Sequence, residues 1–158
     1  MFTAAADVQD TVEDGDRGLW GGVVINGFAP INDCPEGTEG GTAECTKEGE
    51  ANSGTFGGNN PNDNSGILRY LRVEFAGIEF SPDNELNGIA FQGVGRGTVV
   101  DHVQVHFNED DGIEMFGGTV DLKYMVLTGI ADDSVDWTEG WQGRAQFVAV
   151  VQYGDDAD

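Results

Sequence analysis

The chain has 158 residues, which is one domain's worth of sequence and enough to bury a sizeable core. Its 29 acidic residues against seven lysines and arginines give a net charge of −22, which argues against nucleic acid or an anionic membrane as a partner, because both need a basic surface. Twenty-five glycines beside 39% hydrophobic residues indicate many turns in a folded chain, and no apolar run is long enough for a transmembrane helix.

The N-terminal part predicts one strand followed by a long insertion. A strand is expected around Val23 to Asn26, and the polar residues 32–65 are expected to form a loop. Met1 to Thr3 resemble the middle of a strand, "FTAAADVQD" resembles the tail of a coil, and no signal peptide is visible. We therefore expect a fragment of a longer chain whose export signal lies upstream.

The two cysteines, Cys34 and Cys45, lie in the predicted loop. They form no CxxC pair and no histidine is near them, so the spacing does not indicate a metal site. We predict a local disulfide that pins the loop and implies an oxidising compartment. Two unpaired surface thiols are the alternative.

The rest of the chain repeats itself in units of 21 to 24 residues, beginning at Asn87. One column of equivalent positions holds Ile89, Ile113 and Val135, and a second holds Phe91, Met115 and Trp137. A further alignment matches Val103, Val105 and Phe107 with Tyr124, Val126 and Thr128, and these with Phe147, Ala149 and Val151. Acidic pairs follow in phase, at Asp110-Asp111, Asp132-Asp133 and Asp155-Asp156.

Within each unit, apolar and polar residues alternate with the period of a strand. The residues expected to face inward are Val103, Val105 and Phe107 in one segment and Leu71, Val73 and Phe75 in another. Those expected to face outward are His102, Gln104 and His106, with Arg72 and Glu74. No segment has a convincing helical period.

Short strands in units of this length predict an all-β fold, a right-handed parallel β-helix of about six coils. A leucine-rich repeat would need a leucine and asparagine pattern that is absent, and a β-sandwich would not repeat its residue types at this step. We expect a single domain over residues 1–158, with the insertion at 32–65 and a shorter one at 81–86.

Five motifs carry a family resemblance: "RGLWGGVVINGFAPIN", "FGGNNPNDNSGILRYLRVEFAG", "NELNGIAFQGVGRGT", "DDGIEMFGGTV" and "ADDSVDWTEGWQGRAQF". Together they resemble a family of bacterial secreted or surface lipoprotein-like right-handed β-helix proteins of largely unknown function, found in marine Proteobacteria and Bacteroidetes. The resemblance implies this fold and a place outside the cell or on the outer-membrane surface. More distantly, the stacked coils are similar to those of pectate lyases and polygalacturonases.

Two acidic clusters lie at corresponding points of adjacent units. Equivalent residues of neighbouring coils stack about 4.8 Å apart. Glu114 and Asp136 should therefore point outward side by side, with Asp111 stacked on Asp133 at the preceding turn. Like charges so close repel by about 1 kcal/mol per exposed pair and by more when buried. Something is expected to neutralise them.

Three interpretations of the acids remain open. The first is a Ca²⁺ site, with ligands drawn from Asp110, Asp111, Glu114, Asp132, Asp133 and Asp136. The second is a polysaccharide-active enzyme, a lyase or glycoside hydrolase, with Asp111, Asp133 and Asp136 as catalytic carboxylates. The His-Gly and Arg-x-Lys elements of polygalacturonases are absent, and Arg144 is the nearest candidate for a lyase base. The third is a set of solvated coil corners in which the acids cap turns.

Other candidates are weaker. Trp141, with Glu139, is a candidate for sugar binding, whereas Trp137 follows the inward pattern and is expected in the core. His102 and His106 share an outward face but lack a third metal ligand. The sequence thus favours an exported, non-catalytic module that binds a glycan or protein at the cell surface, with Ca²⁺ as the candidate ion. The alternatives are the enzyme and a subunit that stacks end to end into a fibre.

Overall fold

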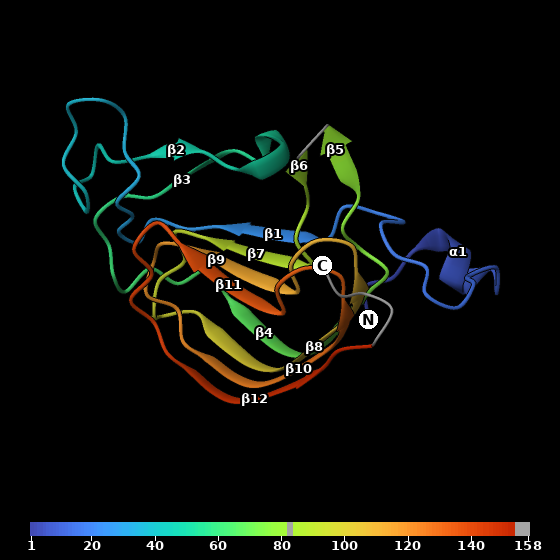
Figure 1. Ribbon diagram of the computed structural model, residues 1–158. Coiled ribbons are helices and arrows are strands. Elements are labelled where there is room, and N and C mark those ends of the chain that lie inside the picture. The colour runs from blue at the N-terminus through green and yellow to red at the C-terminus, as the bar shows by residue number, and fades with distance from the viewer. Residues whose placement is uncertain (82–83, 154–158) are drawn as a thin grey trace.

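The computed structural model describes residues 1–81 and 84–153 (Figure 1). The elements in chain order are α1 (Ala5–Val8), β1 (Val23–Asn26), β2 (Lys47–Glu48), the 3-10 helix η1 (Glu50–Asn52), β3 (Thr55–Phe56), β4 (Ile67–Glu74), β5 (Glu79–Ser81), β6 (Asn84–Glu85), β7 (Ile89–Gln92), β8 (Val99–Asn108), β9 (Ile113–Phe116), β10 (Leu122–Ile130), β11 (Val135–Thr138) and β12 (Ala145–Val151). No described helix is long and apolar enough to cross a membrane.

Two parallel sheets face each other and form the body of the molecule (Figure 1). Sheet I has the strand order β1-β7-β9-β11, and sheet II has the order β4-β8-β10-β12. Each further turn of the chain adds one strand to each sheet, as in a parallel β-helix. The all-β parallel prediction is confirmed. Each sheet has four strands in the described residues, so the expected count of about six coils is not confirmed.

The interior columns of sheet I follow the predicted register. Ile89 pairs with Ile113, and Ile113 pairs with Val135, with Val23 adding a fourth position at the other edge. Ile89 and Ile113 are fully buried. The strand β1 also has the predicted bounds. Short apolar strands separated by glycine and aspartate turns therefore pack as the sequence indicates.

In sheet II the predicted register is wrong by one residue between β8 and β10, where Val103 pairs with Met125 and not with Tyr124. Between β10 and β12 the predicted register is confirmed, because Val126 pairs with Ala149 and Thr128 with Val151. A one-residue slip moves every side chain to the other face, so Tyr124 lies outside. The cause is a bend in each strand, where one residue with positive φ adds a second outward position and breaks the alternation. These residues are Tyr70, His102, Tyr124 and Phe147.

Two more residues that were predicted in the core, Phe75 and Phe107, lie at a second bend with positive φ, which turns their side chains out of the core. Their rings stack on each other at 6.1 Å between centroids, and Phe107 also stacks on Tyr153. Both rings are partly exposed, so the inward prediction fails for them. Trp137 was also predicted in the core and is 60% exposed, because β11 is the last strand of sheet I.

The N-terminal segment covers part of sheet II. Phe2 forms a parallel bridge with Val73, and the indole nitrogen of Trp20 donates to the carbonyl of Glu74 at 2.7 Å. Glu74, which was predicted to face outward, is only 5% exposed beside this segment. The residues between Phe2 and Trp20 include the short helix α1, where the sequence predicted the tail of a coil.

The insertion at 32–65 is more ordered than the predicted loop. β2 and β3 pair in antiparallel fashion, and the predicted disulfide Cys34–Cys45 is present. Cys45 and Phe56 are buried with Ile31 in a small core of their own. Figure 1 shows this insertion beside sheet I. In the shorter insertion β5 pairs with β6, and residues 82–83 lie outside the described chain.

Candidate metal centre

The acidic residues gather at the outer face of sheet I, near the start of β9 and β11. Glu114 pairs with Asp136 across these strands, as predicted, and each lies one position after an inward residue. In the strand on the other side, the position equivalent to Glu114 holds Ala90. The acids are therefore confined to the later coils of the sheet.

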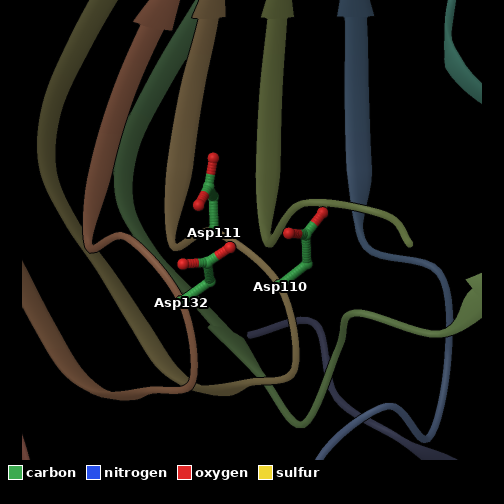
Figure 2. Close-up of side chains that lie close together, drawn as sticks. All are labelled: Asp110, Asp111 and Asp132. Atoms are coloured by element: carbon green, nitrogen blue, oxygen red, sulfur yellow. The ribbon is translucent and has the colours of Figure 1, made fainter. Parts of the chain in front are cut away.

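Two overlapping groups of carboxylates converge there. In each group one oxygen from every member lies within 4.8 Å of the others. One group is Asp110, Asp111 and Asp132, whose carboxyl groups gather at the turns leading into the strands (Figure 2). The other is Asp111, Glu114 and Asp136. Asp111 belongs to both, and we call the second group the acidic centre because it is the more buried.

Asp133 has a different role from the one predicted. Its backbone N–H donates to Asp111 Oδ1 at 3.1 Å, while its side chain is exposed and belongs to neither group. The turn thus presents a peptide donor to Asp111 instead of a stacked carboxylate. The third acidic pair of the repeat, Asp155-Asp156, lies outside the described residues.

Glu114 is held by side chains on both sides. Its Oε2 accepts a hydrogen bond from Asn87 Nδ2 at 2.9 Å, and its Oε1 accepts one from Thr138 Oγ1 at 3.2 Å. The residue is 8% exposed although it sits on the outer face of the sheet. The outer face is solvated only where the insertion does not cover it.

The insertion adds a carboxylate that the sequence analysis missed. Glu50, in η1, accepts hydrogen bonds from Asn87 Nδ2 at 3.2 Å and from Gln92 Nε2 at 3.3 Å. A side chain at Gly49 would overlap Gln92 Oε1, so glycine permits this close approach of the insertion to β7. Glu50 lies in no repeat and is one of several acids in a polar segment. No periodic signal could have singled it out.

Burial and mutual repulsion raise the pKa of three carboxyl groups in this region, those of Glu114, Asp111 and Glu50. Burial is the main cause of the rise in the pKa of Glu114 to about 8, with the charges of Glu50, Asp111 and Asp136 adding to it against the Asn87 hydrogen bond. Burial also raises the pKa of Asp111 to about 7, helped by Asp110, Asp136 and Asp132. The pKa of Glu50 rises to about 7 for the same primary reason. The site holds negative charge poorly at neutral pH.

The acidic centre has no basic partner within residues 1–81 and 84–153. No lysine or arginine there forms an ion pair with Asp111, Glu114 or Asp136. All the converging atoms are oxygens, the donor type preferred by Ca²⁺ and Mg²⁺. The buried Oδ1 of Asn87 also has no hydrogen-bond partner. The donor set therefore fits a hard divalent cation.

The two predicted sugar-binding residues are already engaged. Trp141 donates its indole N–H to the carbonyl of Val120 at 3.1 Å and packs against the core. Glu139 Oε1 pairs with Lys47 Nζ of the insertion at 2.7 Å, and Lys47 also pairs with Asp33. A hollow of about 280 Å³ separates the insertion from sheet I beside this pair. Among its lining residues are Glu50, Phe80, Gln92 and Phe116.

Comparison with known families agrees with this architecture. A family model described as a pectate-lyase-like β-helix domain matches residues 3–158. The chain belongs to this family. No curated protein and no solved structure matches it. The distant likeness to pectate lyases is thereby supported, whereas the lipoprotein and marine affiliations predicted from the motifs stay predictions.

In this pectate-lyase-like β-helix, the predicted lyase base is not at the acids. Arg144 directly precedes β12 of sheet II, and its Nη2 lies 2.5 Å from Asp121 Oδ2. The two histidines are also placed elsewhere, within aromatic contacts of sheet II. Among the described residues, the carboxylates come together at the outer face of sheet I with their amide partners and the hydroxyl of Thr138.

Proposed function

We propose that the protein is an exported β-helix module whose acidic centre binds Ca²⁺. The observation that carries this proposal is the convergence of three carboxylates, Asp111, Glu114 and Asp136, without a basic partner in the described chain. Three carboxylates offer six oxygens, and Ca²⁺ takes six to eight. A bound divalent ion would offset the repulsion and burial that raise the pKa values of Asp111 and Glu114.

The cation would also join separate parts of the fold. Its ligands come from the turn before β9, from β9 itself and from β11, and Asn87 connects Glu114 to Glu50 of the insertion. Binding would thus stabilise the contact between two coils and the covering insertion. Because a ligand that binds only the folded state raises stability, thermal unfolding reports on it.

Melting temperature with CaCl₂ and with chelator tests the proposal, with MgCl₂ as the second ion. We expect the midpoint to rise with Ca²⁺ and the rise to disappear in Asp136→Asn. The exposed Asp14, which has no part in either group, provides the matched control Asp14→Asn. An unchanged wild-type midpoint across the conditions would sink the proposal.

A location outside the cytoplasm is the second part of the proposal. The Cys34–Cys45 disulfide supports it, since disulfides persist in oxidising compartments. There the module would bind a glycan or protein at the cell surface. Detection of the disulfide in protein recovered from intact cells, and accessibility of the chain to external protease, would test the location.

A polysaccharide-active enzyme is the second candidate, favoured by Glu50 and Glu114. Their shared donor Asn87 and their pKa values near 7 and 8 resemble an acid and base tuned to neutral pH. New reducing ends, or the absorbance of unsaturated products, after incubation with polysaccharides would reveal such activity. Absence of turnover in wild type, or equal turnover in Glu114→Gln, would remove this candidate.

A further inference from the structure

The hollow between the insertion and sheet I has the size of a small ligand. It encloses about 280 Å³, and a water molecule takes about 30 Å³ in the liquid, so a compound of about nine non-hydrogen atoms matches the space. Its walls combine carboxylates with aromatic rings, the mixture of polar and apolar groups that is typical of ligand sites. The residues that supply these groups are Glu48, Glu50, Glu139, Phe56, Phe80 and Phe116.

The carboxylates of the hollow are only partly neutralised. Lys47 lines the hollow with a basic side chain, but its ammonium group is already shared between Glu139 and Asp33. Glu50 forms no ion pair with a lysine or arginine in the described part of the chain. Burial is the main cause of its raised pKa, and the charge of Glu139 adds to the rise, so these two carboxylates repel each other. The hollow therefore has an excess of negative charge.

Glu139 also has an acceptor atom without a donor. Its Oε1 pairs with Lys47, whereas its Oε2 is buried and has no hydrogen-bond partner among the described residues. The side chain is only 11% exposed. A buried polar atom is normally hydrogen-bonded, and leaving one unpaired destabilises the fold. A donor with positive charge would satisfy this oxygen and offset the repulsion between Glu139 and Glu50.

The aromatic rings form an apolar wall beside these acids. Phe56 and Phe116 meet edge to face, with their centroids 6.4 Å apart. Phe56 is buried, whereas Phe80, from β5, is 54% exposed. Ring faces attract cations, and the rings also cover apolar groups. The rings and the acids thus favour the same kind of ligand, one that joins a positive charge to an apolar body.

We infer that this hollow binds a small primary ammonium compound with an apolar body. The ammonium group has three donors, which would serve Glu50 and the Oε2 of Glu139, while the body packs on Phe80 and Phe116. A net charge of −22 raises the concentration of cations near the protein. The inference does not depend on calcium binding, because the acidic centre is formed by other carboxylates.

A matched pair of ligands tests the inference. 2-Phenylethylammonium and 2-phenylethanol have the same number of non-hydrogen atoms and differ in charge. Binding to the wild-type protein is measured by titration calorimetry in chelator, so that metal ions at the acidic centre make no contribution. We expect the ammonium compound to bind at least about tenfold more tightly than the alcohol, the effect of one charge-assisted hydrogen bond. Its affinity should fall as NaCl is raised.

Two variants and one control locate the site. Glu50→Gln keeps the size of the side chain and should weaken binding of 2-phenylethylammonium about tenfold, with little effect on 2-phenylethanol. Phe80→Ala removes an exposed ring and should weaken both ligands several-fold, which gives a second readout if Glu50→Gln lowers the melting temperature. Glu13→Gln removes an exposed charge outside the hollow and should change either affinity less than about twofold.

Three results would overturn the inference. These are equal binding of the two ligands, absence of ammonium binding at millimolar concentration, and an ammonium affinity that is the same in wild type, Glu50→Gln and Phe80→Ala. The lysine side chain of another protein carries the same chemical group, so the amide of Nα-acetyl-lysine is titrated as well. If it binds more tightly than 2-phenylethylammonium, the hollow receives a protein side chain and not a free amine.

Discussion

Glu50 and Glu114 accept hydrogen bonds from the same atom. Asn87 Nδ2 lies 3.2 Å from Glu50 Oε2 and 2.9 Å from Glu114 Oε2. One carboxylate comes from the insertion and the other from β9, so a single buried amide links two parts of the chain that are 64 positions apart. Two adjacent acids of raised pKa make this link sensitive to protons and cations alike.

Calcium affinity should rise with pH. Asp111 and Glu114 have pKa values of about 7 and 8, so a cation must displace protons from them at pH 6 but scarcely at pH 8.5. Displacing those protons weakens binding by about a hundredfold or more at the lower pH. Calorimetric titration with Ca²⁺ at the two pH values measures this, and a pH-independent affinity would contradict the assigned ligands.

Without a divalent ion, stability should fall as pH rises from about 5 to about 8. The folded-state pKa values of Asp111 and Glu114 are raised above their unfolded values of 3.8 and 4.5, so their contribution is complete at low pH and is lost as the pH passes through 7 and 8. We expect a loss on the order of 1–2 kcal/mol in chelator. Urea unfolding at several pH values would show it, and added Ca²⁺ should flatten the slope.

Glu114→Gln should have opposite effects with and without calcium. The amide removes a buried charge beside Glu50 and Asp136, so at pH 8.5 in chelator we expect a free energy of unfolding equal to or about 1 kcal/mol above that of wild type. The variant also loses a ligand, so the rise in melting temperature with Ca²⁺ should vanish. If the variant is instead less stable than wild type in chelator, the repulsion argument is wrong.

The Lys47–Glu139 pair should couple strongly in a double-mutant cycle. Their distance is 2.7 Å and the Glu139 side chain is 11% exposed, so Lys47→Met leaves a poorly solvated carboxylate. We expect a loss of about 1–3 kcal/mol for that variant. Adding Glu139→Gln should recover part of the loss, since the orphaned charge is removed. Additive single effects would mean that the pair contributes little.

Sheet I was predictable because its strands keep a simple alternation. The column of Ile89, Ile113 and Val135 and the adjacency of Glu114 and Asp136 both follow from one repeat step. Sheet II was predictable only in part: the step from β10 to β12 was right, but positive φ at Tyr124 and its equivalents places two outward residues in succession, and this hid the step from β8 to β10. An apolar pattern alone does not reveal such a bend when the outward residues are themselves aromatic.

The candidate site was predictable only in part. Asp111, Glu114 and Asp136 belong to the repeat and could be aligned. Glu50 belongs to an insertion that has no counterpart in the repeat, so the repeat could not place it near these residues. Asp133 contributes its backbone N–H and not its carboxylate, which depends on the local geometry of the turn. The burial of Glu114 likewise comes from the insertion and not from the strand that carries it.

The bends of sheet II link the coils to one another. A left-handed backbone costs a non-glycine residue roughly 1–2 kcal/mol, and a stacked aromatic pair returns about 0.5–1.5 kcal/mol. His102 and Tyr124 each stack on two neighbours. Replacing either residue with glycine would relieve the backbone strain at one position but remove two ring contacts, so the loss extends to the neighbouring coils on both sides. The stacked rings at the first bend of the sheet II strands therefore stabilise the coils cooperatively, because the contacts of each ring depend on the rings of the neighbouring coils.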